Sequence, residues 1–186
     1  MTIHWQDNPA RLDHLMIESN NPTEIAKFYC KALLMTQSKQ GPLIMVEGRE
    51  RKLLIARGSS RKLGFGAFAF DSDSGLAKLR HSLERAGITL EPSPSPLFPD
   101  GAFLLKDPDD NCLVFCRSTG RLHNSEMPAR LQHLVVATDE ITPMVDFYTE
   151  KLGFGITDCV EDETGGLRAC FLNSDDEYHS FAIFNS

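Results

Sequence analysis

The sequence predicts an α+β protein made of tandem βαβββ modules, and three observations support this fold class. Residues 131–154 repeat residues 12–35 without a gap, at a constant offset of 119 positions. Alternating apolar segments and amphipathic helices recur in the order strand, helix, strand, strand, strand. This unit is roughly 55 residues long and occurs three times, a period that is typical of a modular fold. The positions that are identical in both copies are Leu12/Leu131, His14/His133, Leu15/Leu134, Thr23/Thr142, Phe28/Phe147, Tyr29/Tyr148 and Leu33/Leu152.

The first module begins with "LDHLMIES" (residues 12–19), which alternates in hydrophobicity as a strand does. "NPTEIAKFYCKALLM" (residues 21–35) predicts a helix capped by Asn21 or Thr23, because its apolar side chains recur on one face. "PLIMVEGR" and "RKLLIARGS" follow as strands around a turn near Gly48.

The second module begins at Gly64 with the strand "GFGAFAF". "SGLAKLRHSLERAG" predicts a helix that ends at Gly87, since its leucines lie near one face. "ITLEP" is a short strand, and the proline-rich "EPSPSPLFP" is a connection that cannot pair continuously. "GAFLLKD" and "NCLVFCRS" predict a hairpin closed by the tight turn "DPDDN".

The polar segment "RSTGRLHNSEMPAR" has no hydrophobic period and predicts a linker. The third module then reads as the strand "LQHLVVAT", the helix "ITPMVDFYTEKLG" and the strands "FGITDCVED", "LRACFLN" and "HSFAIF". We therefore expect a tail over residues 1–10, a closed pair of modules over residues 11–117, a linker over residues 118–130 and a third module over residues 131–186.

Composition and charge narrow the class of protein. The net charge of −7 argues against a nucleic-acid partner, which usually needs a basic face. No apolar run approaches membrane-spanning length. The N-terminus lacks the basic region followed by an apolar region that is typical of a secretory signal. The five cysteines form no C-x-x-C pair, which argues against a disulfide framework or a zinc knuckle. We expect a cytoplasmic protein with free thiols, no membrane partner and no nucleic-acid partner.

The repeated "LDHLMIES…FYCKALL" and "LQHLVVATDE…FYTEKLGF", together with "DPDDN", resemble the vicinal oxygen chelate superfamily, which includes glyoxalase I, bleomycin resistance proteins and extradiol dioxygenases. "DPDDN" resembles the Asp-Pro-Asp-Gly-Asn turn of that family, with Asp110 in place of glycine. The tandem layout looks most like the type I extradiol ring-cleavage dioxygenases, which carry four modules in two paired domains. In these relatives the N-terminal pair is metal-free and the C-terminal pair holds iron.

This resemblance implies a dioxygenase that inserts O2 into a small catechol-like aromatic diol at a non-heme Fe(II), with Mn(II) as another metal that the site could use. Such a site needs two histidines and one carboxylate on one face. By resemblance His133 is the first metal ligand, and strand alternation points it away from the helix if Leu134 and Val136 pack beneath it. A partly buried structural histidine is the other interpretation.

By the same resemblance His179 is the catalytic acid–base residue and not a metal ligand; a strand-start histidine beside a solvated turn is the alternative. Alternation in "HSFAIF" predicts that His179 shares a face with Phe181 and Ile183. His14 matches His133, but the second module opens with "GFGAFAF", which has no histidine to match it, and Val114 stands where metal-binding relatives have glutamate. We therefore expect His14 to be structural and residues 11–117 to be metal-free.

Two metal ligands expected by resemblance would lie in a fourth module beyond Ser186. We expect residues 131–186 to be the first half of a catalytic-type domain, and residues 1–186 alone to hold no tightly bound iron. A longer polypeptide, a second chain in a homo-oligomer, or a metal-free binding protein would each account for the incomplete site. A longer polypeptide is favoured, because an uncovered apolar sheet face is costly to leave in water. The alternative functions are a metal-free resistance-type binding module and a glyoxalase- or epimerase-like metalloenzyme.

Overall fold

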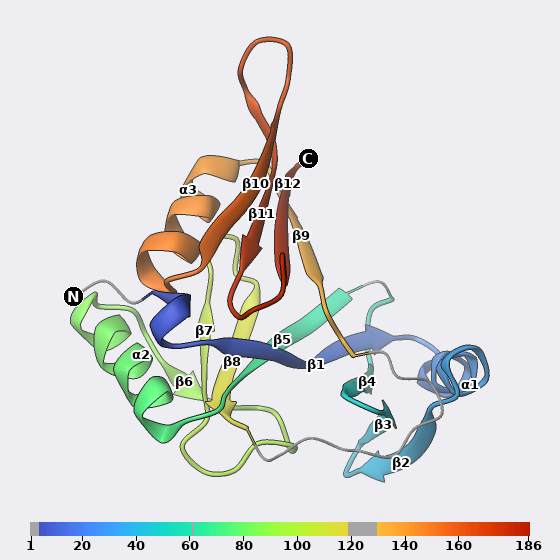
Figure 1. Ribbon diagram of the computed structural model, residues 1–186. Helices are drawn as coiled ribbons and strands as arrows, with labels where there is room; N and C mark the ends of the chain where they lie inside the picture. Colours follow the sequence, from blue (N-terminus) through green and yellow to red (C-terminus); the bar gives the residue numbers. More distant parts are fainter. Residues whose placement is uncertain (1–3, 61, 119–129) are drawn as a thin grey trace.

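The structure is a computed structural model that describes residues 4–60, 62–118 and 130–186, and it confirms the α+β class with three βαβββ modules (Figure 1). The first module comprises β1 (Ala10–Ser19), α1 (Pro22–Leu33), β2 (Thr36–Gln40), β3 (Leu43–Gly48) and β4 (Arg51–Arg57). The second comprises β5 (Lys62–Phe70), α2 (Asp73–Arg85), β6 (Glu91–Pro92), β7 (Phe103–Lys106) and β8 (Cys112–Arg117). The third comprises β9 (Leu134–Thr138), α3 (Ile141–Asp146), a π-helical turn (Phe147–Lys151), β10 (Gly155–Glu161), β11 (Leu167–Asn173) and β12 (Phe181–Asn185).

The three modules share one topology. In each, the first strand pairs in parallel with the last strand, and the remaining strands follow antiparallel. The first two modules join through antiparallel pairing of β1 with β5, which produces an eight-stranded sheet in the order β2-β3-β4-β1-β5-β8-β7-β6. The third module is a separate four-stranded sheet in the order β10-β11-β12-β9. Strand β9 is therefore an edge strand among the described residues.

The two halves of the eight-stranded sheet enclose an apolar interior, and α1 and α2 each pack on an outer side. The enclosed cluster consists of Met45, Leu54, Phe65, Ala67, Leu104 and Val114. Leu97 and Phe98 of the predicted proline-rich connection pack against this cluster. No helix of the described residues is long and apolar enough to cross a membrane.

The third module docks on the outer side of the second module through a continuous core. Its helical segment contributes Tyr148, which is fully buried and donates a hydrogen bond from its hydroxyl to Asp107 Oδ2 at 2.9 Å. Phe154 packs edge-on against Phe68 of β5, with ring centroids 5.6 Å apart. The turn "DPDDN" closes the β7–β8 hairpin and thus also contacts the third module.

The N-terminal residues, predicted as a tail, contact the third module. Residues Trp5–Asp7 form a 3-10 turn, and the backbone N–H of Trp5 donates to the carbonyl of Gly153 at 2.9 Å. The backbone of Ala10 exchanges two hydrogen bonds of 2.7 Å with Ser174, one with its carbonyl and one with its hydroxyl. Figure 1 shows this blue segment running beside α3.

Two elements differ from the sequence prediction. Strand β2 was not predicted, because all five of its side chains are polar and it lies at the edge of the sheet, paired with β3. The predicted helix over residues 141–153 changes from α to π geometry at Phe147. Such π turns are rare and are often found at functional sites. The predicted linker falls largely on residues 119–129, outside the described residues.

Candidate active site

His14 lies in the interior of the eight-stranded sheet with both ring nitrogens engaged. Its Nδ1 is 2.7 Å from Asp13 Oδ1 and its Nε2 is 2.8 Å from Ser95 Oγ. Lys52 Nζ approaches the two Asp13 oxygens at 3.2 and 3.3 Å. Burial lowers the pKa of His14 despite the neighbouring Asp13 carboxylate. Neither nitrogen of this imidazole is free to bind a metal.

Among the described residues, the row across the sheet that contains His14 supplies no further metal ligand. His14 pairs with Ala67 of β5, and Ala67 pairs in turn with Val114 of β8, so the three residues form one row across the sheet. Val114 is fully buried in the apolar interior. The structural role expected for His14 agrees with this environment, although it stays a prediction.

His133 and His179 lie side by side at one end of the third sheet. Their ring centroids are 4.8 Å apart, with the rings nearly perpendicular at 79°. Phe171 of β11 contacts both rings, at 6.4 Å from His133 and 5.2 Å from His179. The parallel register of β9 with β12, in which Leu134 pairs with Phe181, brings the two segments together.

Each of these imidazoles has a buried nitrogen without a partner. Nε2 of His133 and Nδ1 of His179 are shielded from solvent and have no hydrogen-bond partner among the described residues. Burial lowers the pKa of His133, and the neighbouring His179 lowers it further. His133 is therefore held as a neutral imidazole, the form that binds a metal ion.

The residue preceding each repeated histidine explains the contrast between them. Asp13 precedes His14 at an irregularity in the β1–β5 pairing, and its carboxylate bonds the imidazole. The equivalent residue before His133 is Gln132, which is exposed and donates to Glu177 at 3.3 Å. In the first copy the preceding side chain thus hydrogen-bonds the imidazole, whereas in the second copy it does not.

The predicted face of His179 requires a correction. Phe181 and Ile183 belong to the core beneath the helix, and Phe181 stacks on Tyr148 at 4.2 Å. His179 lies instead on the opposite side, with Phe171. Alternation does not extend to His179 because it precedes β12, and the intervening Ser180 turns inward to bond Ser174.

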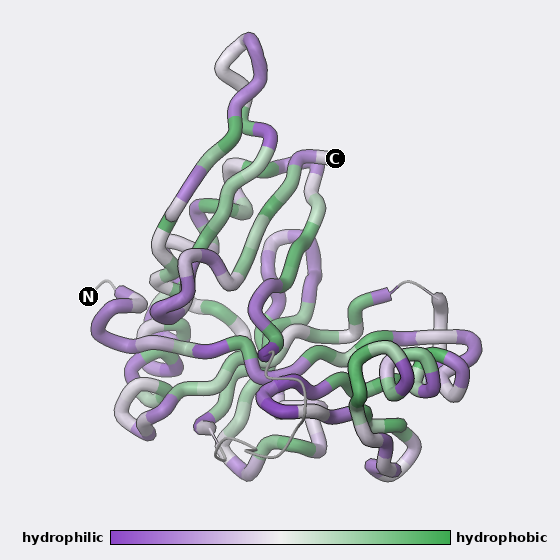
Figure 2. The backbone as a smooth tube through the Cα atoms, turned by 45° about the vertical axis from the view of Figure 1, so that its right-hand side comes forward, coloured by the Kyte–Doolittle hydropathy of each residue, from purple (hydrophilic) through white to green (hydrophobic). Residues whose placement is uncertain are grey.

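The histidine pair borders an apolar face of the third sheet that no described residue covers. On β9, Leu134 and Val136 are buried, while Val135 between them is 51% exposed. Phe184 of β12 is 40% exposed and contacts Phe171. Figure 2 shows hydrophobic residues along these strands. We call the side of the sheet that carries His133, Val135, Phe171 and Phe184 the open face.

These residues fit a metal site only in part. Imidazole nitrogens are suitable donors for Fe(II). In the portions of the chain that the structure describes, however, no group of three or more histidine, cysteine or acidic residues is arranged to hold a metal ion. The histidine pair can supply two nitrogen atoms, and any further ligand must come from elsewhere.

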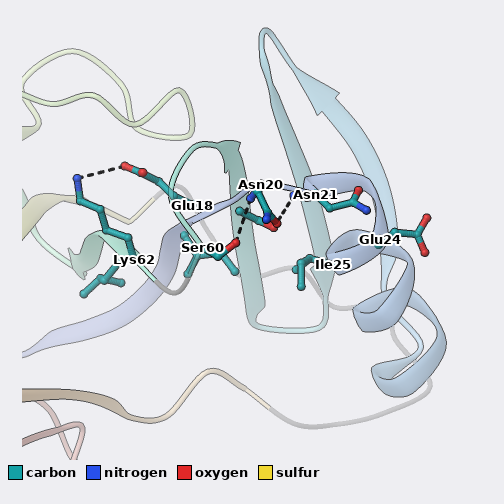
Figure 3. Close-up of a pocket in the computed structure, with 10 residues that line it drawn as sticks. Glu18, Asn20, Asn21, Glu24, Ile25, Ser60 and Lys62 are labelled. Atoms are coloured by element: carbon teal, nitrogen blue, oxygen red, sulfur yellow. Dashed lines mark hydrogen bonds and ion pairs between the residues drawn. The ribbon is translucent and has the colours of Figure 1, made fainter.

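A hollow of about 520 Å³ lies far from the histidine pair in sequence, between the end of β1 and the start of α1 (Figure 3). Its charged groups are paired, with Lys62 3.5 Å from Glu18, and the backbone N–H of Asn20 donates to Ser60 Oγ. It contains no histidine or cysteine. The unpartnered nitrogens make the histidine pair, and not this hollow, the candidate active site.

Sequence reasoning missed two groups around the site. Phe171 was not singled out, although same-face spacing in "LRACFLN" places it on the side opposite Leu172. Arg130 was assigned to the linker, but it pairs with Asp175 at 3.6 Å and also with Glu177, next to the segment that carries His179. Only the folded register of β9, β11 and β12 brings these residues together.

The fold is similar to that of ring-cleaving dioxygenases of known structure. The 2,3-dioxygenase LapB from Pseudomonas sp. KL28 superposes with a TM-score of 0.81 at 18% identity, over 96% of this chain and 71% of its own. Homoprotocatechuate 2,3-dioxygenase from Arthrobacter globiformis gives a TM-score of 0.78 at 17% identity, over 96% and 60%. BphC, a halotolerant catechol dioxygenase, gives 0.78 at 17% identity, over 95% and 65%.

At these identities the likeness establishes the fold, and the chain spans about two thirds or less of the length of the last two structures. A comparison with curated proteins found no match. The model of the glyoxalase/bleomycin resistance protein/dioxygenase superfamily matches residues 11–115 and 130–186, which together cover most of the chain. The chain therefore belongs to the glyoxalase/bleomycin resistance protein/dioxygenase superfamily.

Proposed function

We propose that this chain contributes part of the active site of an extradiol-type ring-cleavage dioxygenase, which inserts both atoms of O2 into a catechol-like aromatic. The observation that carries the proposal is the pair of buried, unpartnered imidazole nitrogens of His133 and His179 on an open sheet face. The similarity in fold to catechol-type dioxygenases supports the same reaction class.

In this proposal His133 is a ligand of Fe(II), with Mn(II) as the alternative metal. Its lowered pKa keeps the imidazole neutral at pH 7, so no proton must be displaced before it binds. The metal, when bound, supplies the open coordination positions for the diol oxygens and O2. Phe171 packs against the His133 ring and restricts its rotation.

His179 is the proposed acid–base residue. Its Nδ1 faces no described partner and is available to take a proton from a diol hydroxyl and return it later in the reaction. Histidine is the side chain that most often transfers protons as a general acid or base. The rings of Phe171 and Tyr178 flank His179 at 5.2 and 5.5 Å and limit its orientations.

The remaining ligands and the cover of the open face come, in this proposal, from outside the 186 residues. Either a further module of a longer polypeptide or a second subunit of a homo-oligomer can provide them. The exposed Val135 and Phe184 would be buried by that partner. We expect the 186-residue chain alone to bind no stoichiometric iron.

The test is anaerobic loading with Fe(II), followed by catechol and air, for the 186-residue chain and for a version extended by one further module. We expect iron and the yellow ring-cleavage product only in the extended protein, or in a dimer fraction separated by gel filtration. His81→Ala, which changes an exposed histidine of α2, is the matched control and should retain both. Iron-loaded extended protein that turns over no catechol-type diol would refute the proposal.

The alternative proposal is a metal-free module that binds an apolar ligand. The exposed apolar side chains of the open face favour it, since they could contact such a ligand directly. Ligand binding that persists in chelator and in His133→Ala would support the binding module. Metal-dependent conversion of a small chelating substrate, without O2 uptake, would instead indicate a glyoxalase- or epimerase-like enzyme.

A further inference from the structure

Two cysteines of the third module face each other across neighbouring strands. Cys159 of β10 and Cys170 of β11 are direct partners in the antiparallel ladder, and their Sγ atoms are 2.8 Å apart. Both are free thiols. The other three cysteines of the chain have no thiol partner among the described residues.

The backbone at this pair already meets the geometric requirement of a disulfide. Directly opposed residues in an antiparallel ladder have Cα atoms about 4.5–5.5 Å apart. Disulfides form when the Cα atoms are about 4.4–6.8 Å apart, with a sulfur–sulfur bond of about 2.05 Å. The sulfurs of Cys159 and Cys170 therefore need to approach by less than 1 Å from 2.8 Å, a movement that rotation about the side-chain bonds can provide.

The two thiols differ in solvent accessibility, so we expect them to have different roles when the protein is oxidised. Cys159 is exposed, whereas Cys170 is fully buried in the core that joins the second and third modules. Burial, followed by the hydrogen bond and charge of Cys159, raises the pKa of Cys170 to about 12. An oxidant therefore reaches Cys159 first, and Cys170 stays a protonated thiol beside it.

We propose that Cys159 and Cys170 are a reversible redox modification site that forms a cross-strand disulfide when the protein meets hydrogen peroxide. The Cys159 sulfur attacks the peroxide, the O–O bond breaks, and Cys159 becomes a sulfenic acid with release of water. The Cys170 sulfur then attacks the Cys159 sulfur and the S–O bond breaks. The leaving hydroxide takes the thiol proton of Cys170, and a second water leaves. In sum, two thiols and one H2O2 give one disulfide and two H2O, and a dithiol reductant reverses the reaction.

The disulfide would connect the edge strand β10 to β11 at a position next to Phe171. Because Phe171 contacts both His133 and His179, the cross-link lies one residue from the wall of the histidine pair. Cys170 points to the core side of β11 and Phe171 to the open face, so the disulfide does not occupy that face.

The experiment treats the 186-residue protein with a small excess of hydrogen peroxide, blocks remaining thiols with N-ethylmaleimide and analyses intact mass and peptides. We expect two of the five thiols to escape labelling, a mass lower by two hydrogens before labelling, and a peptide that links Cys159 to Cys170. Dithiothreitol should restore all five labels. The matched control Cys116→Ser, which removes a buried cysteine without a thiol partner, should form the same cross-link.

Cys159→Ser changes an exposed side chain and should fold normally, yet it should lose the cross-link and keep its remaining four thiols. Cys170→Ser should leave Cys159 as a sulfenic acid that dimedone captures, or that oxidises further to sulfinic acid. The proposal is wrong if the wild-type protein accumulates sulfinic acid at Cys159 as fast as Cys170→Ser does. A peroxide-induced disulfide that joins two chains, or a pair of other cysteines, would overturn it equally.

Discussion

Replacing Tyr148 with phenylalanine tests how the third module is held on the second. The substitution removes one hydroxyl from a fully buried side chain and keeps the ring that stacks on Phe181. The hydroxyl donates to Asp107 Oδ2 at 2.9 Å, and that oxygen retains one other donor, Asn111 Nδ2, also at 2.9 Å. The lost contact is therefore a single buried hydrogen bond to an acidic side chain.

The expected cost follows from the nature of this bond. A hydrogen bond to a charged group contributes about 1.5–3 kcal/mol, and the small space left by one oxygen adds little. We expect Tyr148→Phe to lower the free energy of unfolding by about 2 kcal/mol. For a chain of this size, that corresponds to a decrease in Tm of about 4–8 °C.

Urea unfolding at pH 7 measures this change, because a shift of the midpoint at constant m-value reports stability alone. The matched control is Tyr29→Phe, which changes the equivalent tyrosine of the first module. The Tyr29 side chain is only partly buried and its hydroxyl makes no hydrogen bond to a described residue. We expect the control to stay within about 0.5 kcal/mol of the wild type.

A second measurement uses alkaline pH. Burial, and then the charge of Asp107, raises the pKa of Tyr148 well above its ordinary value. The tyrosine thus stabilises the fold fully below its unfolded pKa of about 10, and this contribution is lost as pH rises toward the folded pKa. Wild-type protein should lose stability above pH 10 more steeply than Tyr148→Phe. If Tyr148→Phe and Tyr29→Phe have equal midpoints and equal alkaline slopes, the hydrogen bond does not hold the third module.

Three further outcomes are expected. As the pH falls below about 6.5, the wild type should lose stability in urea titrations, because the unfolded chain binds a proton that the buried His14, with its lowered pKa, does not bind. His14→Asn should have a flatter profile. The disulfide closes a loop of about 12 residues between Cys159 and Cys170. The free energy of unfolding of the oxidised protein should therefore be about 3 kcal/mol higher than that of the reduced protein, and an equal Tm would contradict this. In the extended protein of the proposed function, His133→Ala should lose iron by metal analysis. His179→Ala should keep iron but form yellow product about 10²–10⁴-fold more slowly, and equal iron loss in both variants would reject these roles.

The order of elements could be predicted because hydrophobic periodicity is a local property. The helix containing Phe28 and Tyr29 and the strand before it were identified from side-chain spacing alone, and their repetition revealed the modular fold. Strand β2 could not be predicted in this way. Its residues are polar, and its strand conformation depends on hydrogen bonds to β3.

The candidate site was predictable as a pair of histidines but not as a geometry. Within β9 the alternation is regular, with Leu134 and Val136 buried and Val135 exposed, and the side of the preceding His133 stays a prediction from that alternation. The side on which His179 lies depends on Ser180, whose hydroxyl bonds inward to Ser174 and interrupts the alternation. A hydrogen bond such as the one between Ser180 and Ser174 does not change the spacing of hydrophobic residues along the chain. Hydrophobic periodicity therefore could not predict it.

The hydrogen bonds between Ala10 and Ser174 have a consequence for the order in which the protein is made. These residues are 164 positions apart, so Ser174 is synthesised only after most of the described chain has been made. The first two modules can pair β1 with β5 earlier, because that contact spans far fewer residues. Until Gly153 and Ser174 emerge, Trp5 and Ala10 lack these hydrogen-bond partners. A ribosome stalled within the third module would therefore expose the segment from Trp5 to Ala10, and chain segments in that condition are where misassembly between molecules begins.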